Sequence, residues 1–234
     1  MNNLFALLQR NPYPGRGIVL GATPDKTRAV AAYFIMGRSE NSRNRIFTVH
    51  ETGIRTRAHD ESRMIDPSLI IYAPVRTVGA QTVVTNGDQT DTVCAYLARG
   101  KSFADALATR TFEPDAPNYT PRISGLLEAD GGYTLSILKS ADGDPAACRR
   151  FFYTYNPIPG QGHLIHTYQG DGDPLPSFIG EPWTVETEDD MGAFAQTLWT
   201  SLNADNKVSL FVRYITIGTG ETETLIFNRH EEAE

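Results

Sequence analysis

The chain has 234 residues, 40% of them hydrophobic, which is enough for one domain spanning residues 1–234 with a substantial core. Its formal net charge of −7 argues against a general nucleic-acid-binding surface, although a few arginines in a pocket can still bind an anion. Two cysteines cannot form a disulfide framework, and the sequence has neither a signal-peptide layout nor an apolar run of membrane-spanning length, so we expect a cytoplasmic protein.

Strands dominate the first third of the expected structure. They are apolar runs bounded by turn residues, and they cover 17–21, 29–36, 45–50, 53–57, 69–78 and 81–85. The third and fourth form a hairpin with its turn at 51–53. The last two form a pair that turns near Gly79.

Two helices follow in the middle of the chain. The first is predicted over 88–99, where Gly100 supplies a stop signal. The second covers 102–109 and opens with Ser102 and Asp105, a helix-capping pattern. Further strands are expected over 122–128, 133–139 and 149–155.

The segment 156–182 is rich in Gly and Pro, and a loop of that length is usually functional or poorly ordered. One strand is expected inside it, over 163–168. The clearest helix covers 188–202, where apolar residues recur at three- and four-residue spacing. Strands over 208–217 and 223–228 precede an end, 230–234, that is expected to fray. Many strands, few helices and hairpin-like links indicate an α+β fold with mostly antiparallel sheets.

Residues 37–45 combine three arginines with two serines between two predicted strands. The guanidinium fork suits phosphate oxygens, and Ser and Asn side chains can complete such a cradle. The alternative is a solvated polar loop. Because Glu40 is the only acid among the arginines, the cluster favours an anionic ligand. The residues expected to bind that anion are Arg38, Ser39, Arg43, Asn44 and Arg45.

Two other polar stretches have both a functional and a structural interpretation. Residues 85–92 link a strand to a helix, where backbone N–H groups attract anions, yet ordinary helix capping would explain Asn86 equally well. Glu113 follows a helix and Arg122 starts a strand. These two charges could face one cleft or form an ion pair on a loop, and taken alone each stretch favours the structural interpretation.

Histidines and aspartates after the middle of the chain suggest a metal site by residue type alone: His163, His166, Asp171 and Asp173. A His-x-x-His spacing on a strand puts the two rings on opposite faces, and no zinc or calcium pattern fits. We therefore expect substrate contacts or structural roles, and no metal. Cys94 lies in a predicted helix without a neighbouring base, which indicates a buried structural thiol.

Four stretches, in order along the chain, resemble the archaeal-type IMP cyclohydrolase family. They lie within residues 17–127 and comprise Val30 to Tyr33 leading into Gly37-Arg38-Ser39 and Asn44-Arg45, then Ile71 to Arg76, Val83 to Thr92, and Thr120 to Ile123. Residues 162–182 look like the longer bacterial branch of that family. Each stretch is weak alone, and the ordered set is fairly specific.

The resemblance implies a four-layer αββα sandwich like that of N-terminal-nucleophile hydrolases. This sequence departs from those hydrolases at Asn2, where their self-processing chemistry needs Cys, Ser or Thr. The implied activity closes the pyrimidine ring of 5-formamido-1-(5-phosphoribosyl)imidazole-4-carboxamide to give IMP and water in purine biosynthesis. The implied partner is this small ribonucleotide, with no metal or other cofactor, no nucleic acid and no membrane. Whether the chain forms a homo-oligomer is left open by the resemblance.

Carried over position by position, the resemblance also assigns residues. Arg43 or Arg45 matches the substrate-binding arginine, and the longer spacing here leaves both open. Tyr72 matches an active-site tyrosine that would hydrogen-bond the formyl or departing oxygen. Glu113 matches the active-site glutamate that would bind the carboxamide and move its proton. The remaining substrate-binding candidates are Asn86, Asp91 and Arg122, beside Arg38, Ser39 and Asn44.

Two other functions are compatible with the sequence. A nucleotide-binding regulatory module could keep the pocket without turnover, although the presence of both Tyr72 and Glu113 speaks against it. An amidase could use the same scaffold, although Asn2 counts against the usual mechanism.

Overall fold

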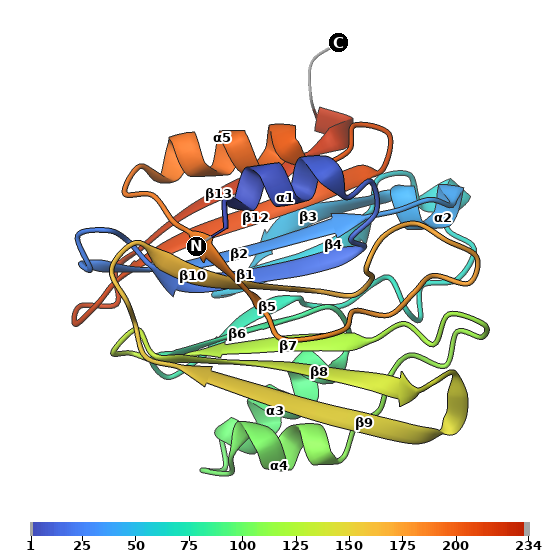
Figure 1. Cartoon of the computed structure of the whole chain (residues 1–234), viewed down its shortest axis with the longest axis horizontal. Coiled ribbons are helices and arrows are strands. Elements are labelled where there is room, and N and C mark those ends of the chain that lie inside the picture. The colour runs from blue at the N-terminus through green and yellow to red at the C-terminus, as the bar shows by residue number, and fades with distance from the viewer. Residues whose placement is uncertain (1, 232–234) are drawn as a thin grey trace.

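Two stacked β-sheets form the centre of the molecule, whose computed structural model describes residues 2–231 (Figure 1). The first sheet has six strands in the order β11-β10-β1-β2-β12-β13, and every neighbouring pair is antiparallel. Its strands are β1 (Arg16–Ala22), β2 (Arg28–Met36), β10 (Gln161–His166), β11 (Trp183–Glu186), β12 (Lys207–Thr216) and β13 (Thr222–Asn228). Strands from the two ends of the chain therefore meet in one sheet.

The second sheet has seven strands, and each pairs with the next along the chain in an antiparallel meander. They are β3 (Arg45–His50), β4 (Gly53–Ala58), β5 (Val75–Val78), β6 (Gln81–Thr85), β7 (Arg122–Leu127), β8 (Tyr133–Ala141) and β9 (Asp144–Tyr155). The hairpin-like links expected from the sequence are thus confirmed for this sheet.

Helices cover the outer faces of both sheets (Figure 1). Apolar residues of α1 (Leu4–Arg10) and α5 (Met191–Ser201) pack on the first sheet, and those of α3 (Gln89–Leu97) and α4 (Phe103–Ala108) pack on the second. A short helix, α2 (Glu40–Arg43), and the 3-10 turn η1 (Glu61–Arg63) lie in connecting segments. This order of layers confirms the expected α+β sandwich, while the likeness to N-terminal-nucleophile hydrolases stays a prediction.

Strand β2 shows why two sheets and two helix layers are needed, because both of its faces are buried. Val30, Ala32 and Phe34 belong to the core beneath α1 and α5. Ala31 and Tyr33 belong to the core between the sheets. Successive side chains of a strand point to opposite faces, so a strand that is apolar on both faces must lie between two packed layers.

Most predicted elements are confirmed, but the strand expected over 69–78 is wrong in its first part. Only β5 is extended, and β4 pairs with it at a single position, Ile54 with Val75. The backbone N–H groups of Ile70 and Ile71 both donate to the Pro67 carbonyl, so the chain turns there instead of running straight. Helices α1 and α2 and strand β11 have no counterpart among the elements predicted from the sequence.

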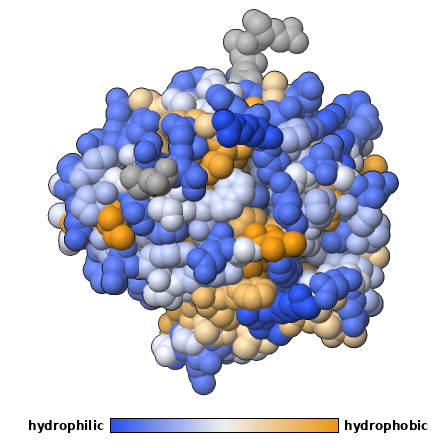
Figure 2. All heavy atoms as spheres, viewed as in Figure 1, coloured by the Kyte–Doolittle hydropathy of each residue, from blue (hydrophilic) through white to orange (hydrophobic). Residues whose placement is uncertain are grey.

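The chain end expected to fray, 230–234, is described as far as Glu231, within the 3-10 turn η2 (Arg229–Glu231). The rest of that stretch lies outside the described residues. In the described part of the chain, no helix is long and apolar enough to cross a membrane. The face shown in Figure 2 is mainly hydrophilic, with apolar surface gathered near its centre and lower half.

Candidate active site

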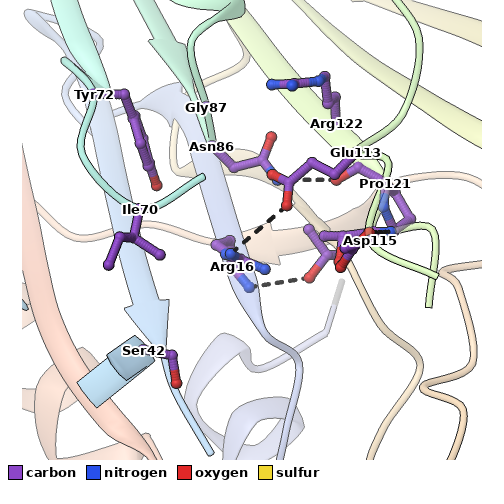
Figure 3. Close-up of polar contacts among 12 residues, drawn as sticks. Arg16, Ser42, Ile70, Tyr72, Asn86, Gly87, Glu113, Asp115, Pro121 and Arg122 are labelled. Atoms are coloured by element: carbon purple, nitrogen blue, oxygen red, sulfur yellow. Dashed lines mark hydrogen bonds and ion pairs between the residues drawn. The ribbon is translucent and has the colours of Figure 1, made fainter. Parts of the chain in front are cut away.

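A carboxyl group and a guanidinium face each other inside the molecule (Figure 3). Glu113, from the segment between α4 and β7, is only 2% exposed. Arg16 begins β1, and its Nη2 lies 4.0 Å from Oε2 of Glu113, which is too far for a hydrogen bond but close enough for attraction. Burial raises the pKa of Glu113 to about 7, although Arg16 and Arg122 act in the opposite direction. Near neutral pH this carboxyl can therefore both accept and donate a proton.

Arg16 stays a cation in this environment. Burial acts to lower its pKa, but Glu113, Tyr168 and Tyr72 hold the pKa of Arg16 well above the ordinary value. Its Nε is buried and has no hydrogen-bond partner among the described residues. A buried N–H group without a partner is rare and indicates a position that a ligand can satisfy.

Tyr72 lies across the site from Glu113, and its hydroxyl pairs with a second tyrosine hydroxyl (Figure 3). The hydroxyl oxygens of Tyr33, on β2, and Tyr72, just before β5, are 2.7 Å apart. Burial raises the pKa of Tyr33 well above its usual value, so this phenol keeps its proton. Thr56 on β4 fixes the Tyr72 backbone: its hydroxyl accepts from Tyr72 N at 2.8 Å and lies within donating distance of the carbonyl oxygens of Ile70 and Tyr72.

Arg45 supplies a second buried guanidinium within electrostatic reach of both tyrosines. It is fully buried at the start of β3, and its Nε donates to the Ser42 carbonyl at 2.8 Å. Burial and the charge of Arg16 lower the pKa of Arg45, whereas Tyr72 and Tyr33 raise it. Its Nη1 has no partner among the described residues. The buried cluster of Arg16, Tyr33, Arg45, Tyr72 and Glu113 thus has surplus positive charge and unused hydrogen-bond donors, which suits an oxygen-rich ligand.

A polar scaffold behind Glu113 holds the segment that carries it. Asn86 donates to the Pro121 carbonyl at 2.9 Å and accepts from Ile123 N at 2.9 Å. Arg122 donates to Gln89 Oε1 at 2.6 Å and pairs with Asp88 at 2.7 Å. Figure 3 shows Asn86 and Arg122 beside Glu113. Their described contacts are to protein groups, which position the segment.

The same segment is closed by a second set of hydrogen bonds. Glu113 N donates to the Thr120 carbonyl at 2.9 Å, and Asp115 accepts from Thr120 N at 2.7 Å. The Thr120 hydroxyl also hydrogen-bonds Asp115 and the hydroxyl of Tyr168. Tyr168 follows β10, so the long segment after that strand packs directly on the loop that carries Glu113.

Only some residues of the arginine-rich segment 37–45 lie in this site. Arg45 lies in the cluster, whereas Arg43 donates to the Gly37 carbonyl at 2.9 Å and to Asn206 at 3.1 Å. Arg38 pairs with Asp171 at 2.5 Å and lies over the ring of Tyr13.

The other substrate-binding candidates are likewise occupied by protein contacts. Ser39 caps α2, and Asn44 exchanges two hydrogen bonds with the backbone of Asp60. Asp91 is largely exposed and pairs with Arg76. Among the sequence candidates, the structure therefore brings together Tyr72, Glu113 and Arg45, with Asn86 and Arg122 adjoining them.

The histidines lie in other surroundings. His163 Nδ1 is 2.7 Å from the Tyr133 hydroxyl, and His166 Nδ1 is 2.7 Å from the Tyr168 carbonyl oxygen. Burial lowers the pKa of each imidazole to about 4, so both rings are neutral near pH 7. Within residues 2–231, no group of three or more His, Cys, Asp or Glu is arranged to hold a metal ion. Cys94 is buried, and burial raises its pKa.

Arg16 is the residue of this cluster that the sequence analysis missed. The available signal was an arginine at the head of an otherwise apolar strand. Tyr33 lay within a matching stretch but was not assigned a role. Asp115, Thr120 and Tyr168 gave no local signal, because their contacts join segments that lie far apart in sequence.

Comparisons with known proteins agree with the predicted family. A family model described as IMP cyclohydrolase-like protein matches residues 13–221. The IMP cyclohydrolase of Methanopyrus kandleri is 30% identical over 168 residues, which cover 70% of this chain and 79% of that protein. The matched range includes Arg16, Tyr72 and Glu113. The chain belongs to the IMP cyclohydrolase-like protein family.

Proposed function

We propose that this chain is an IMP cyclohydrolase, which closes 5-formamido-1-(5-phosphoribosyl)imidazole-4-carboxamide to IMP and water in purine biosynthesis. The observation that supports this most is the buried carboxyl of Glu113, with a pKa of about 7, across the site from Tyr72, whose hydroxyl pairs with that of Tyr33 (Figure 3). The family match and the named relative point to the same reaction.

Ring closure needs a proton carrier at the attacking nitrogen. The carboxamide nitrogen is a poor nucleophile, and it must lose a proton as it bonds to the formyl carbon. Glu113 takes that proton in its carboxylate form. Protonated Glu113 delivers that proton to the former formyl oxygen, which gives a neutral carbinolamine. The formamido nitrogen then loses its own proton as its bond to the former formyl carbon becomes double, and Glu113 passes that proton to the departing hydroxyl group, so that water leaves. A group with a pKa near the working pH serves both steps.

The hydroxyl and guanidinium groups across the site act on the oxygen. Tyr72, held by Tyr33 and Thr56, donates to the formyl or departing oxygen. Arg45 offers a free buried N–H to an anionic or carbonyl oxygen of the ribonucleotide. Asn86 and Arg122 keep the Glu113 segment in place through their contacts with Pro121 and Asp88. Holding the formyl group in its reactive rotamer can supply much of the rate.

The decisive experiment adds purified protein to the formamido ribonucleotide and follows IMP by absorbance, with and without a chelator. We expect IMP to form in both conditions. Glu113→Gln should lower kcat by about 100-fold or more, because general acid–base catalysis contributes about that much. The exposed Glu186→Gln, on β11, is the matched control and should keep the wild-type rate.

The outcomes separate this proposal from its alternatives. A protein that binds the ribonucleotide without forming IMP would be a regulatory module. Release of ammonia from simple amides would indicate an amidase. Loss of activity with chelator would require a metal, and an unchanged kcat in Glu113→Gln would remove that residue from proton transfer.

A further inference from the structure

Arg16 has an unused hydrogen-bonding edge inside the proposed site. Nε and Nη2 lie on the same edge of a guanidinium, and both N–H groups point the same way. In this protein Nη2 lies 4.0 Å from the Glu113 carboxylate, and Nε has no partner among the described residues. The side chain is only 11% exposed, so water cannot readily compensate. This edge is ready to receive an oxygen atom next to Glu113.

The chemistry at Glu113 produces such an oxygen. When the carboxamide nitrogen bonds to the formyl carbon and loses its proton to Glu113, negative charge builds on the former formyl oxygen. Buried, fixed donors stabilise that charge strongly because they need no reorganisation when it develops. Arg16 is charged, buried and adjacent to the proton carrier.

We propose that Arg16 is a further catalytic residue, which donates hydrogen bonds from its Nε edge to the oxygen that becomes negative as the ring closes. This inference rests on the proposed cyclohydrolase function. Tyr72, fixed by Tyr33 and Thr56, donates to the same oxygen as a neutral group, so Arg16 adds the charged donor at that oxygen. This role also explains why a strand that is otherwise apolar begins with an arginine whose side chain is only 11% exposed.

Two substitutions separate hydrogen bonding from charge. Arg16→Lys keeps a cation but loses the planar fork of donors, and Arg16→Met removes both. Each should lower kcat by about 100- to 1000-fold, with a smaller change in KM, as for the loss of an oxyanion donor. Arg28→Met is the matched control, because Arg28 begins β2, pairs with Glu223 and lies over Tyr214, outside the site. It should keep the wild-type kcat.

The pH profile gives a second readout that a merely structural role would not produce. Arg16 lowers the pKa of Glu113 against the effect of burial. The acidic limb of the rate profile should therefore move to higher pH in Arg16→Met and stay in place in Arg16→Lys. A 13C NMR titration of the Glu113 carboxyl measures the same shift without relying on turnover, and thermal unfolding of both variants checks that they fold.

Three results would overturn the inference: a kcat within threefold of wild type in folded Arg16→Lys and Arg16→Met, a loss confined to KM, or a Glu113 titration that is the same in Arg16→Met and wild type. A wild-type protein that forms no IMP would instead remove the proposed function, before any variant is compared.

Discussion

At the scale of single residues, the proton on Glu113 links the proposed catalysis to stability. The pKa of this group is about 7 in the folded chain, above its ordinary 4.5. Between these values the folded chain binds more protons than the unfolded chain, so raising the pH through this window lowers the free energy of unfolding. At about 1.4 kcal/mol per pH unit, the loss is about 3 kcal/mol.

Urea unfolding of wild type and Glu113→Gln at about pH 5 and about pH 8 measures that loss. The variant has no titrating group at this position. Its free energy of unfolding, relative to that of wild type, should therefore rise by about 3 kcal/mol between the two pH values. Groups common to both proteins, such as the neutral His166, cancel in the comparison. Parallel pH dependences in the two proteins would contradict the raised pKa.

Local patterns could nominate Glu113 and a group of arginines, and the family resemblance could nominate Tyr72, but neither could choose among the arginines. Arg43 and Arg45 are two residues apart in one polar stretch. What separates them is tertiary: Arg43 bonds to Gly37 and Asn206, while Arg45 turns inward at the start of β3. Arg16 was missed because its partner Glu113 is brought to it only by the stacking of the two sheets.

At the scale of elements, the turn before β5 explains how Tyr72 reaches the site. Thr56 is fully buried and its hydroxyl contacts the backbone at Ile70 and Tyr72. Thr56→Val keeps the shape but leaves Tyr72 N and the Ile70 carbonyl without this partner, while the Tyr72 carbonyl still accepts from Thr56 N. The free energy of unfolding should fall by about 1–3 kcal/mol, and kcat should fall because Tyr72 is less well held.

Thr56→Ser restores the hydroxyl and should recover most of both losses. Thr48→Val is the control on the neighbouring strand, since its hydroxyl makes only a 3.4 Å contact with the Arg55 carbonyl. Chemical denaturation and steady-state kinetics give the two readouts. If Thr56→Val retains wild-type kcat, this contact does not position Tyr72.

The same turn shows where strand patterns fail. The apolar run from residue 69 is typical of a buried strand, but Pro67 accepts two backbone hydrogen bonds and β4 reaches only Val75. Helix α4 is the opposite case, because its cap is local. Ser102 and Asp105 form the expected capping box, and the helix begins where the pattern predicts.

At the scale of the whole molecule, the class of fold could be predicted and the strand order of the first sheet could not. In the second sheet each strand pairs with its neighbour in sequence, and short links predict the pairs β3–β4 and β5–β6, whereas longer segments join β4 to β5 and β6 to β7. In the first sheet β10 pairs with β1 and β12 pairs with β2, so its order depends on contacts between distant segments. The first sheet also places Arg16 and Tyr33 on the neighbouring strands β1 and β2, and the stacking of the two sheets then brings Arg16 to Glu113.

The two sheets are further joined by the buried side-chain amide of Asn228, which no local sequence pattern predicts. Asn228, at the end of β13, accepts from Phe47 N at 2.8 Å, donates to the Phe47 carbonyl at 3.0 Å, and accepts from Ser209 at 2.7 Å. Phe47 lies on β3, so these bonds connect the edge strands of both sheets. Because Asn228 is 4% exposed, its removal would leave buried groups without partners.

Asn228→Ala should therefore lower the free energy of unfolding by about 2 kcal/mol or more. Asn41→Ala removes an amide with a single 3.5 Å contact and should change stability much less. Unfolding followed by tryptophan fluorescence, which reports on the first sheet through Trp183 and α5 through Trp199, can be compared with far-UV circular dichroism, which reports on both sheets. If the sheets unfold as one unit, the two transitions coincide in wild type and shift together in Asn228→Ala. A variant as stable as wild type would show that the stacked core alone holds the sheets together.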